Sequence, residues 1–216
     1  MRLRNKLLFL FLFAAASLTA QSFEGAITFQ IHSAQQQGEL ELLLSPKGIR
    51  AEFKGQNNVV MLIKRDATDA IQLNPKTKTY RDIDLQEQRR LSASVGKLEK
   101  FEVEKLGKEL VLNVVCHHFK LKSAKRTLEI WAAESLVDST HLTRLIDVGT
   151  LVGISPNAIE VMQKENLNGL PLKVIATEPS GSAQVEAKRI VRKSFKSSLF
   201  EVEKSYRKEE NNAEMQ

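Results

Sequence analysis

The sequence holds a single cysteine, Cys116, among its 216 residues. A lipid-anchored lipoprotein needs a cysteine directly after the site where its signal peptide is cleaved. The cleavage site expected in this chain follows Ala20, and the next two residues are Gln21 and Ser22. We therefore expect no acylation. A lone cysteine in an oxidising compartment is usually buried or paired with another chain, and the apolar residues before Cys116 favour burial.

Sequence motifs of several enzyme classes are missing. No Gly-x-Ser-x-Gly run, phosphate loop or dinucleotide fingerprint occurs, because the glycines are scattered singly. Gly153-Ile154-Ser155 and Gly181-Ser182 are better explained by a helix cap and a turn. We expect no enzyme and assign no catalytic residue.

A pair of carboxylates assembled in space would escape a motif search, so a hydrolase stays as a third hypothesis. Glu129 beside Trp131 is the candidate here, because a carboxylate and an aromatic ring on one strand face can cradle a sugar or an amphiphile. The alternative interpretation is an exposed strand glutamate next to a packed indole.

A large excess of positive charge is also missing. The chain has 32 Lys and Arg against 26 Asp and Glu, and aromatic residues make up 6%. A nucleic-acid-binding protein is expected to show a basic stripe with interleaved aromatics, whereas the densest basic stretches, Lys120–Arg126 and Lys188–Lys196, look like solvated strand faces. We expect no nucleic-acid partner.

The N-terminus has the layout of a signal peptide. Arg2, Arg4 and Lys6 precede Leu7–Leu18, which contains no charge. This apolar run is shorter than the roughly 20 residues of a membrane-spanning helix. We predict a signal peptide over 1–20, cleavage after Ala20, and a periplasmic or secreted chain with no transmembrane segment. An uncleaved membrane anchor is the alternative.

No Pro/Gly/Ser-rich linker divides the rest of the chain, so we predict one β-rich domain over 21–207. The charged end, 208–216, is predicted to be a disordered tail. Most of the domain shows the alternation of apolar and polar residues that is typical of half-buried strands. The predicted strands are Phe23–Ile31, 40–44, Ile49–Lys54, Val59–Lys64, Asp69–Leu73, Thr79–Ile83, Phe101–Leu106, Leu110–Cys116, Phe119–Lys122, Leu128–Trp131, Leu170–Thr177 and Gln184–Phe195.

One strand breaks the alternation. Residues 59–63 are Val-Val-Met-Leu-Ile, which is apolar on both faces, so both of its sides must be covered. Helical periodicity appears only late, in His141–Val148 and in a segment that begins at Ser155-Pro156 and ends at Asn168-Gly169. We predict an α+β fold, with a large curved antiparallel sheet and two or three short helices on its concave side.

Several motifs resemble a family of exported proteins from Gram-negative bacteria that is classed as a domain of unknown function. They are 103–109 (VEKLGKE), 116–121 (CHHFKL), 128–131 (LEIW), 169–172 (GLPL) and 200–202 (FEV). The likeness covers about Phe101 to Tyr206. The chain departs from the family pattern at Asn113-Val114, where Gly-Tyr is usual, and at Glu203, where Pro is usual.

The order of elements more distantly resembles the LolA-like lipoprotein-carrier fold, a half-barrel with helices as a lid. That resemblance implies an apolar concavity able to hold acyl chains, and it implies no catalytic residue.

Cys116-His117-His118 invites a metal-binding interpretation. Neighbours on a strand point to opposite faces, so only Cys116 and His118 share a side, and two ligands are too few for a closed site. His32 and His141 have no cysteine nearby. We expect no metal and no cofactor.

Three hypotheses follow. The first is a non-catalytic periplasmic binding or carrier protein for an apolar or lipid-like ligand; the second is a structural or interaction module of the cell envelope with a protein partner; the third is a hydrolase. For the first, the predicted ligand-lining residues are Phe29, Ile31, Leu42, Leu44, Val60, Leu62 and Trp131. The alternative for each of these is ordinary core packing.

Overall fold

The computed structural model describes residues 23–34, 37–55, 58–65, 68–87, 90–91, 99–136, 149 and 151–209. The predicted signal peptide (1–20) and the predicted helix His141–Val148 lie outside these residues. Of the predicted tail, the structure describes Lys208 and Glu209. No helix among the described residues is long and apolar enough to cross a membrane.

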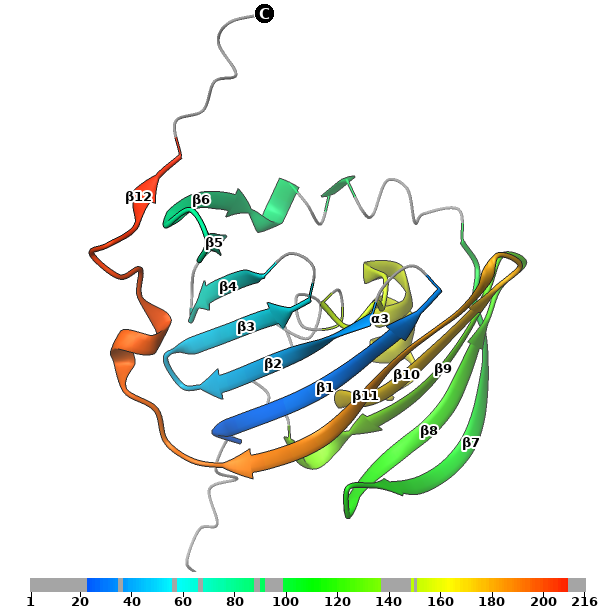
Figure 1. Cartoon of the computed structure of the whole chain (residues 1–216). Helices are drawn as coiled ribbons and strands as arrows, with labels where there is room; N and C mark the ends of the chain where they lie inside the picture. The colour runs from blue at the N-terminus through cyan, green and yellow to red at the C-terminus, as the bar shows by residue number, and fades with distance from the viewer. Residues whose placement is uncertain are drawn as a thin grey trace, which may run out of the picture.

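A single open, curved sheet of 12 strands makes up most of the described chain (Figure 1). The strands are β1 (Gly25–Ser33), β2 (Gln37–Ser45), β3 (Gly48–Lys54), β4 (Val59–Lys64), β5 (Asp69–Asn74), β6 (Thr79–Asp84), β7 (Glu102–Val111), β8 (Val114–Lys122), β9 (Thr127–Ala133), β10 (Leu170–Glu178), β11 (Gly181–Arg192) and β12 (Arg207–Lys208). Their order is β12-β6-β5-β4-β3-β2-β1-β11-β10-β9-β8-β7. The prediction of one large curved sheet is confirmed, and the fold is mostly β.

The middle of the sheet joins two distant parts of the chain. β1 pairs antiparallel with β2 on one side and with β11 on the other. The pairing with β11 contains a bulge between Thr28 and Phe29. At the start of this seam, a Cβ on Gly25 would collide with the carbonyl oxygen of Val191, so the close approach of the two strands requires glycine.

The main core lies on one face of the sheet, which we call the inner face. Alternate residues of most strands point to it and are buried, whereas β6, β7 and β12 have no buried residue. They include Ile27 and Phe29 of β1, Leu40, Leu42 and Leu44 of β2, Ile49 and Ala51 of β3, Phe119 and Leu121 of β8, and Leu128 and Ile130 of β9. The opposite face is called the outer face.

Helix α3 (Pro156–Lys164) packs against the inner face. Its N-terminus has the predicted features: Ser155 is the N-cap, its side-chain oxygen accepts a hydrogen bond from the Ala158 amide, and Pro156 occupies the first turn. Ala158, Ile159 and Met162 are buried in the same cluster as the inner-face strand residues. The helix ends at Lys164, before the predicted Asn168-Gly169, and Asn166 takes a positive φ of 56° just beyond it.

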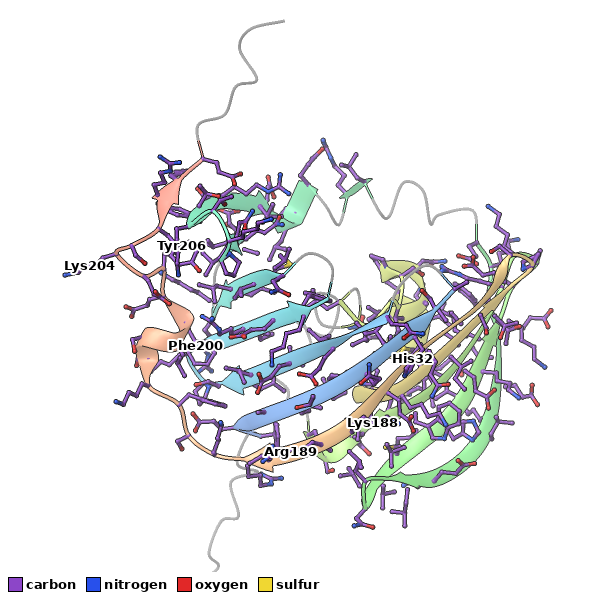
Figure 2. The ribbon with its side chains drawn as sticks, viewed as in Figure 1. His32, Lys188, Arg189, Phe200, Lys204 and Tyr206 are labelled. Atoms are coloured by element: carbon purple, nitrogen blue, oxygen red, sulfur yellow. The ribbon has the colours of Figure 1, made fainter. Side chains whose placement is uncertain are left out.

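The outer face of the first half of the sheet is covered by the segment 195–206, which we call the strap. Figure 2 shows Phe200 and Tyr206 on it, alongside β3 to β6. Phe200, in the 3₁₀ turn η3 (Ser197–Phe200), packs with Ala26 and Leu43, while Val202 and Tyr206 pack against Val60 and Leu62. β12 then pairs with β6 in parallel. The strap therefore covers the second apolar face of β4.

The hairpin β7–β8 differs from the sequence prediction. Leu110–Cys116 was predicted as one strand, but the chain turns at Leu112 and Asn113, whose φ angles are 50° and 64°. Two consecutive positive φ values are typical of a type I′ hairpin turn, which usually carries Asn-Gly. The prediction was wrong because the turn lacks glycine. The sequence also predicted that one strand ends at Leu106 and the next begins at Leu110. In the structure these residues belong to a single strand, β7, with a bulge between Lys105 and Gly107.

Candidate functional site

A pocket of about 490 Å³ opens at one end of the sheet, beside the turn of the β7–β8 hairpin, which stands at the lower edge of the molecule in Figure 1. Three strands and the 3₁₀ turn η1 (Glu134–Leu136) contribute to it. The lining residues are Phe23, Lys108, Asn113, Val114, Val115, His117, Glu134, Ser135, Leu136, Ile190 and Arg192.

The floor of the pocket is apolar. Phe23 and Leu136 are buried, and both belong to the main core cluster. Ile190 packs against the same cluster and pairs with Ile27 across the seam. The floor is thus built by Phe23 just ahead of β1, by the end of β11 and by the 3₁₀ turn η1.

The rim of the pocket carries positive charge. Lys108 and Arg192 are exposed, and neither makes an ion pair with any described residue. Arg192 lies over the ring of Phe23, with its guanidinium carbon 5.1 Å from the ring centroid. The one carboxylate in the lining, Glu134, lies 3.3 Å from Nε2 of His117, so it is already engaged. The rim is therefore suited to a negatively charged group.

The predicted ligand-lining residues lie elsewhere. Phe29, Leu42 and Leu44 are buried in the inner-face core that α3 covers, and Ile31 packs against the edge of that core. None of these four lines the pocket. Whether any of them contacts a ligand stays a prediction.

The other three predicted residues are on the outer face. Val60 and Leu62 lie under the strap, beside Leu73 and Val202. Trp131 points away from its inner-face neighbour Ile130 and stacks on His118, and its side chain is buried and also contacts the main core cluster. The structure thus divides the seven predicted residues between two faces. For Val60 and Leu62 the reason is that β4 is apolar on both faces, so its sequence does not reveal which face points inward.

A network of polar side chains surrounds Trp131 and His118. Nδ1 of His118 lies 2.8 Å from Oε1 of Glu109, and Nε2 lies 2.8 Å from Oε1 of Glu129. Trp131 donates from Nε1 to Oε2 of Glu109 at 2.8 Å, and the Lys173 ammonium lies 4.5 Å from the Trp131 ring centroid. The hydrogen bond from Trp131, followed by that from His118, holds the pKa of the Glu109 carboxyl below its ordinary value against the opposing effect of desolvation.

This group, comprising Glu109, His118, Glu129, Trp131 and Lys173, joins four strands. The predicted candidate Glu129 belongs to it, but its carboxylate is occupied by His118 and by Lys120, whose Nζ lies 3.4 Å away. The chemistry available here is therefore hydrogen bonding between strands.

Cys116 is fully buried on β8, and its thiol contacts the carbonyl oxygen of Val114 at 3.5 Å. Desolvation raises the pKa of the thiol to about 11, so it is protonated at neutral pH. His118 uses both ring nitrogens on carboxylates. Among the described residues, no three or more His, Cys, Asp or Glu side chains gather as metal ligands would.

Sequence reasoning missed Lys108, Arg192 and Leu136 as pocket residues. Each lies at or near the end of its element, and the pocket forms only because the sheet brings β7, β11 and η1 together. A weak signal was available for Arg192, which follows Ile190 and Val191 at the end of a strand and begins a run of basic residues.

A family model described as a domain of unknown function, DUF4412, matches residues 23–206. No curated protein matches the chain.

Three solved structures are similar to this chain at 10–13% sequence identity. PNGF-II shares 13% identity with a TM-score of 0.49, covering 89% of this chain and 32% of its own. MucB, in its complex with MucA from Pseudomonas aeruginosa, shares 10% with a TM-score of 0.47, covering 86% of this chain and 58% of its own. The Mycobacterium tuberculosis lipoprotein LppX shares 10% with a TM-score of 0.40, covering 83% and 91%. The chain thus spans about a third of PNGF-II and somewhat over half of MucB.

Proposed function

The chain belongs to the DUF4412 family, and we propose that it is a non-catalytic periplasmic binding or carrier protein for a lipid-like ligand with an apolar chain and a negatively charged head group. The pocket beside the β7–β8 hairpin carries this proposal. Its volume of about 490 Å³ falls within the range of small-molecule sites, roughly 300–1,000 Å³.

The two halves of the pocket favour an amphiphile. Phe23, Leu136 and Ile190 offer an apolar floor that removes a hydrocarbon chain from water. Lys108 and Arg192 on the rim offer cations without an ion-pair partner among the described residues. A carboxylate or phosphate head group would provide that partner, and Arg can bind either group with two parallel hydrogen bonds.

The proposal takes the inner face as the concave side of the sheet, with α3 and the predicted helix 141–148 covering it. It also takes residues 1–20 as a cleaved signal peptide, which would place the chain where lipids are moved between membranes. Binding of an amphiphile in the pocket requires neither of these two predictions.

Titration calorimetry tests the binding step. We expect decanoate, below its micelle concentration, to bind the wild-type protein, and decanol, which has the same chain without charge, to bind more weakly. In the Lys108→Gln/Arg192→Gln variant the two ligands should bind with similar affinity, because the charge preference is removed. Arg189→Gln is the matched control, since Arg189 is an exposed arginine of the same strand that does not line the pocket.

A second pair of variants locates the apolar chain. Ser135→Trp fills the pocket and should abolish binding of both ligands, whereas Ala124→Trp, in the exposed bend after β8, should leave both unchanged. If neither ligand binds the wild-type protein, or if Ser135→Trp binds as well as wild type, the proposal is wrong. Mass spectrometry of protein purified from its own host identifies the natural ligand.

The non-catalytic part of the proposal is supported by the state of the reactive side chains. The Cys116 thiol is buried and protonated, and the imidazole of His118 is held between two carboxylates. A nucleophile needs an adjacent base that is free to take its proton. A Glu129→Gln variant screened against ester and glycoside substrates tests the hydrolase hypothesis: any wild-type activity that this change removes would overturn our assignment.

One observation favours the second hypothesis, an envelope interaction module. Among the described residues β7 is the edge strand of the sheet, and a short strand of another protein can add to the part of β7 beyond its bulge at Lys105 and Gly107. A protein that binds neither decanoate nor decanol but captures one envelope protein through β7 would support this second function.

A further inference from the structure

The exposed apolar residues of the molecule are concentrated on one hairpin. Six large apolar side chains are exposed in the described part of the chain, and four of them belong to β7, β8 and the turn between them. The four are Leu106 (39% exposed), Leu110 (67%), Leu112 (43%) and Val115 (54%). A soluble surface normally shows such residues singly, so a cluster indicates a contact surface.

Three of these residues form the end of the hairpin. Leu110 and Val115 are cross-strand partners, and Leu112 occupies the turn between them. We call Leu110, Leu112 and Val115 the hairpin tip. Leu112 holds a positive φ of 50°, a conformation that is strained for a leucine and that Asn or Gly would adopt more easily. A leucine there is costly for the fold, which points to a role for its side chain outside the fold.

The hairpin tip is continuous with the pocket mouth. Val115 lines the pocket, and so do Asn113 and Val114 between it and Leu112. Lys108 and Arg192, which have no ion-pair partner in the described part of the chain, lie at the same mouth. Aliphatic side chains next to exposed cations are the combination that inserts shallowly into an anionic lipid surface, with the cations at the level of the head groups.

We propose that the hairpin tip docks on the surface of an anionic lipid bilayer, with the pocket mouth facing the head groups. This inference rests on the proposed function, because docking in this orientation would let an amphiphile pass between the bilayer and the pocket without crossing water.

A second copy of the chain fits the surface less well. Pairing between two β7 strands would use the middle of the strand, which carries Glu104, Lys105 and Lys108 and is interrupted by the bulge at Lys105 and Gly107. Bulges and charges are features that prevent edge-to-edge pairing. The exposed apolar residues lie instead at the end of the hairpin, where a strand paired along β7 would bury little of their surface.

Co-sedimentation of the full chain with vesicles of phosphatidylglycerol and phosphatidylcholine tests the proposal. We expect wild-type protein to sediment with mixed vesicles, less with pure phosphatidylcholine, and less at high salt. Leu110→Ser/Leu112→Asn should weaken binding roughly tenfold, because two apolar side chains no longer insert. Leu199→Ser is the matched control: Leu199 is 40% exposed on η3, away from the hairpin, and its replacement should leave vesicle binding within about twofold of wild type.

The outcomes separate docking from ligand binding. Neither Leu110 nor Leu112 lines the pocket, so the double variant should bind decanoate as wild type does, which also shows that it is folded. If the wild-type protein binds decanoate but not vesicles, the docking proposal alone is wrong. If the wild-type protein does not bind decanoate, the proposed function is wrong. Equal vesicle binding by the wild type and the double variant would also overturn docking on lipid. The same conclusion would follow if the wild type bound no vesicles but formed a concentration-dependent dimer that the double variant does not form.

Discussion

His118 and Trp131 lie face to face across β8 and β9, with ring centroids 4.1 Å apart and ring planes inclined by 13°. Both rings also hydrogen-bond to the carboxylate of Glu109 on β7. The stacked pair therefore ties the edge strand of the sheet to the two strands behind it, and this edge strand is one arm of the hairpin that forms the pocket mouth.

Replacing Trp131 with Phe tests this connection. The variant keeps a ring for the stack on His118 but removes the Nε1–H that Glu109 accepts. We expect a lower urea midpoint and faster hydrogen exchange at the amides of β7, with little change in β1 to β5. Exchange that rises equally in all strands would contradict a local role and indicate general loosening of the core.

The pH dependence of stability has a clear source in Glu99. Burial of this side chain opposes ionisation, but hydrogen bonds from Arg126 and Ser123 outweigh it and hold the pKa of the Glu99 carboxyl below its ordinary value. A carboxyl whose pKa is lowered by folding stabilises the protein above its unfolded pKa of about 4.3, and this contribution is lost as the pH falls through the folded pKa.

We therefore expect the free energy of unfolding of wild type to fall as the pH drops below about 4, and to fall less steeply in Glu99→Gln. Urea titrations across this pH range measure both slopes. Glu201→Gln is the control, since Glu201 is exposed and makes no ion pair with a described residue. A Glu99→Gln slope equal to that of wild type would show that the Arg126 contact does not couple to folding.

The strap contributes to stability through Phe200. This ring is buried against Ala26 and Leu43 and meets Phe195 edge to face, with 6.1 Å between ring centroids. Phe200→Ala should cost about 3 kcal/mol, as for other buried phenylalanines. Its neighbour Leu199 is 40% exposed, so Leu199→Ala should cost less than about 1 kcal/mol. Chemical denaturation of the two variants measures both losses in the free energy of unfolding. Equal losses would mean that Phe200 does not pack against the sheet as described.

The strained turn offers a prediction of the opposite sign. Leu112→Asn places a residue that tolerates positive φ at a position with φ of 50°, so we expect a gain of roughly 0.5–1 kcal/mol in the free energy of unfolding. The same change should weaken vesicle binding. A loss of stability would show that the Leu112 side chain supports the fold after all.

The reactivity of Cys116 gives a further check. The thiol is buried, and its pKa is raised to about 11. Ellman's reagent should label it slowly in the native protein and rapidly in urea, because only unfolding exposes the thiol and lets it ionise. Rapid native labelling would place Cys116 at the surface and revive the alternative of pairing with another chain.

Much of the first half of the sheet was accessible from the sequence, since period two in β1 to β6 gives strand positions within a few residues. The strap was not, because Phe195, Phe200, Val202 and Tyr206 follow neither a helical nor a strand period. Their partner is the second apolar face of β4, whose need for cover was predicted without any indication of what covers it.

The candidate site was less accessible than the fold. Apolar alternation identifies buried residues, and it therefore selected Phe29, Leu42 and Leu44, which form the core. A pocket lies where packing stops, at the ends of strands, and its position depends on which strands become neighbours. The β1–β11 pairing that decides this joins residues about 160 positions apart, and nothing in a local pattern records it.

That pairing also has a consequence for how the chain assembles. The sheet's central seam closes between residues near the two ends of the described chain, so the halves β2–β6 and β7–β10 can each form hairpins early but must wait for β11 before they become one body. We expect folding to be governed by this late step. A ribosome or translocation channel that still holds the last sixth of the chain would therefore hold two unjoined half-sheets rather than a folded protein.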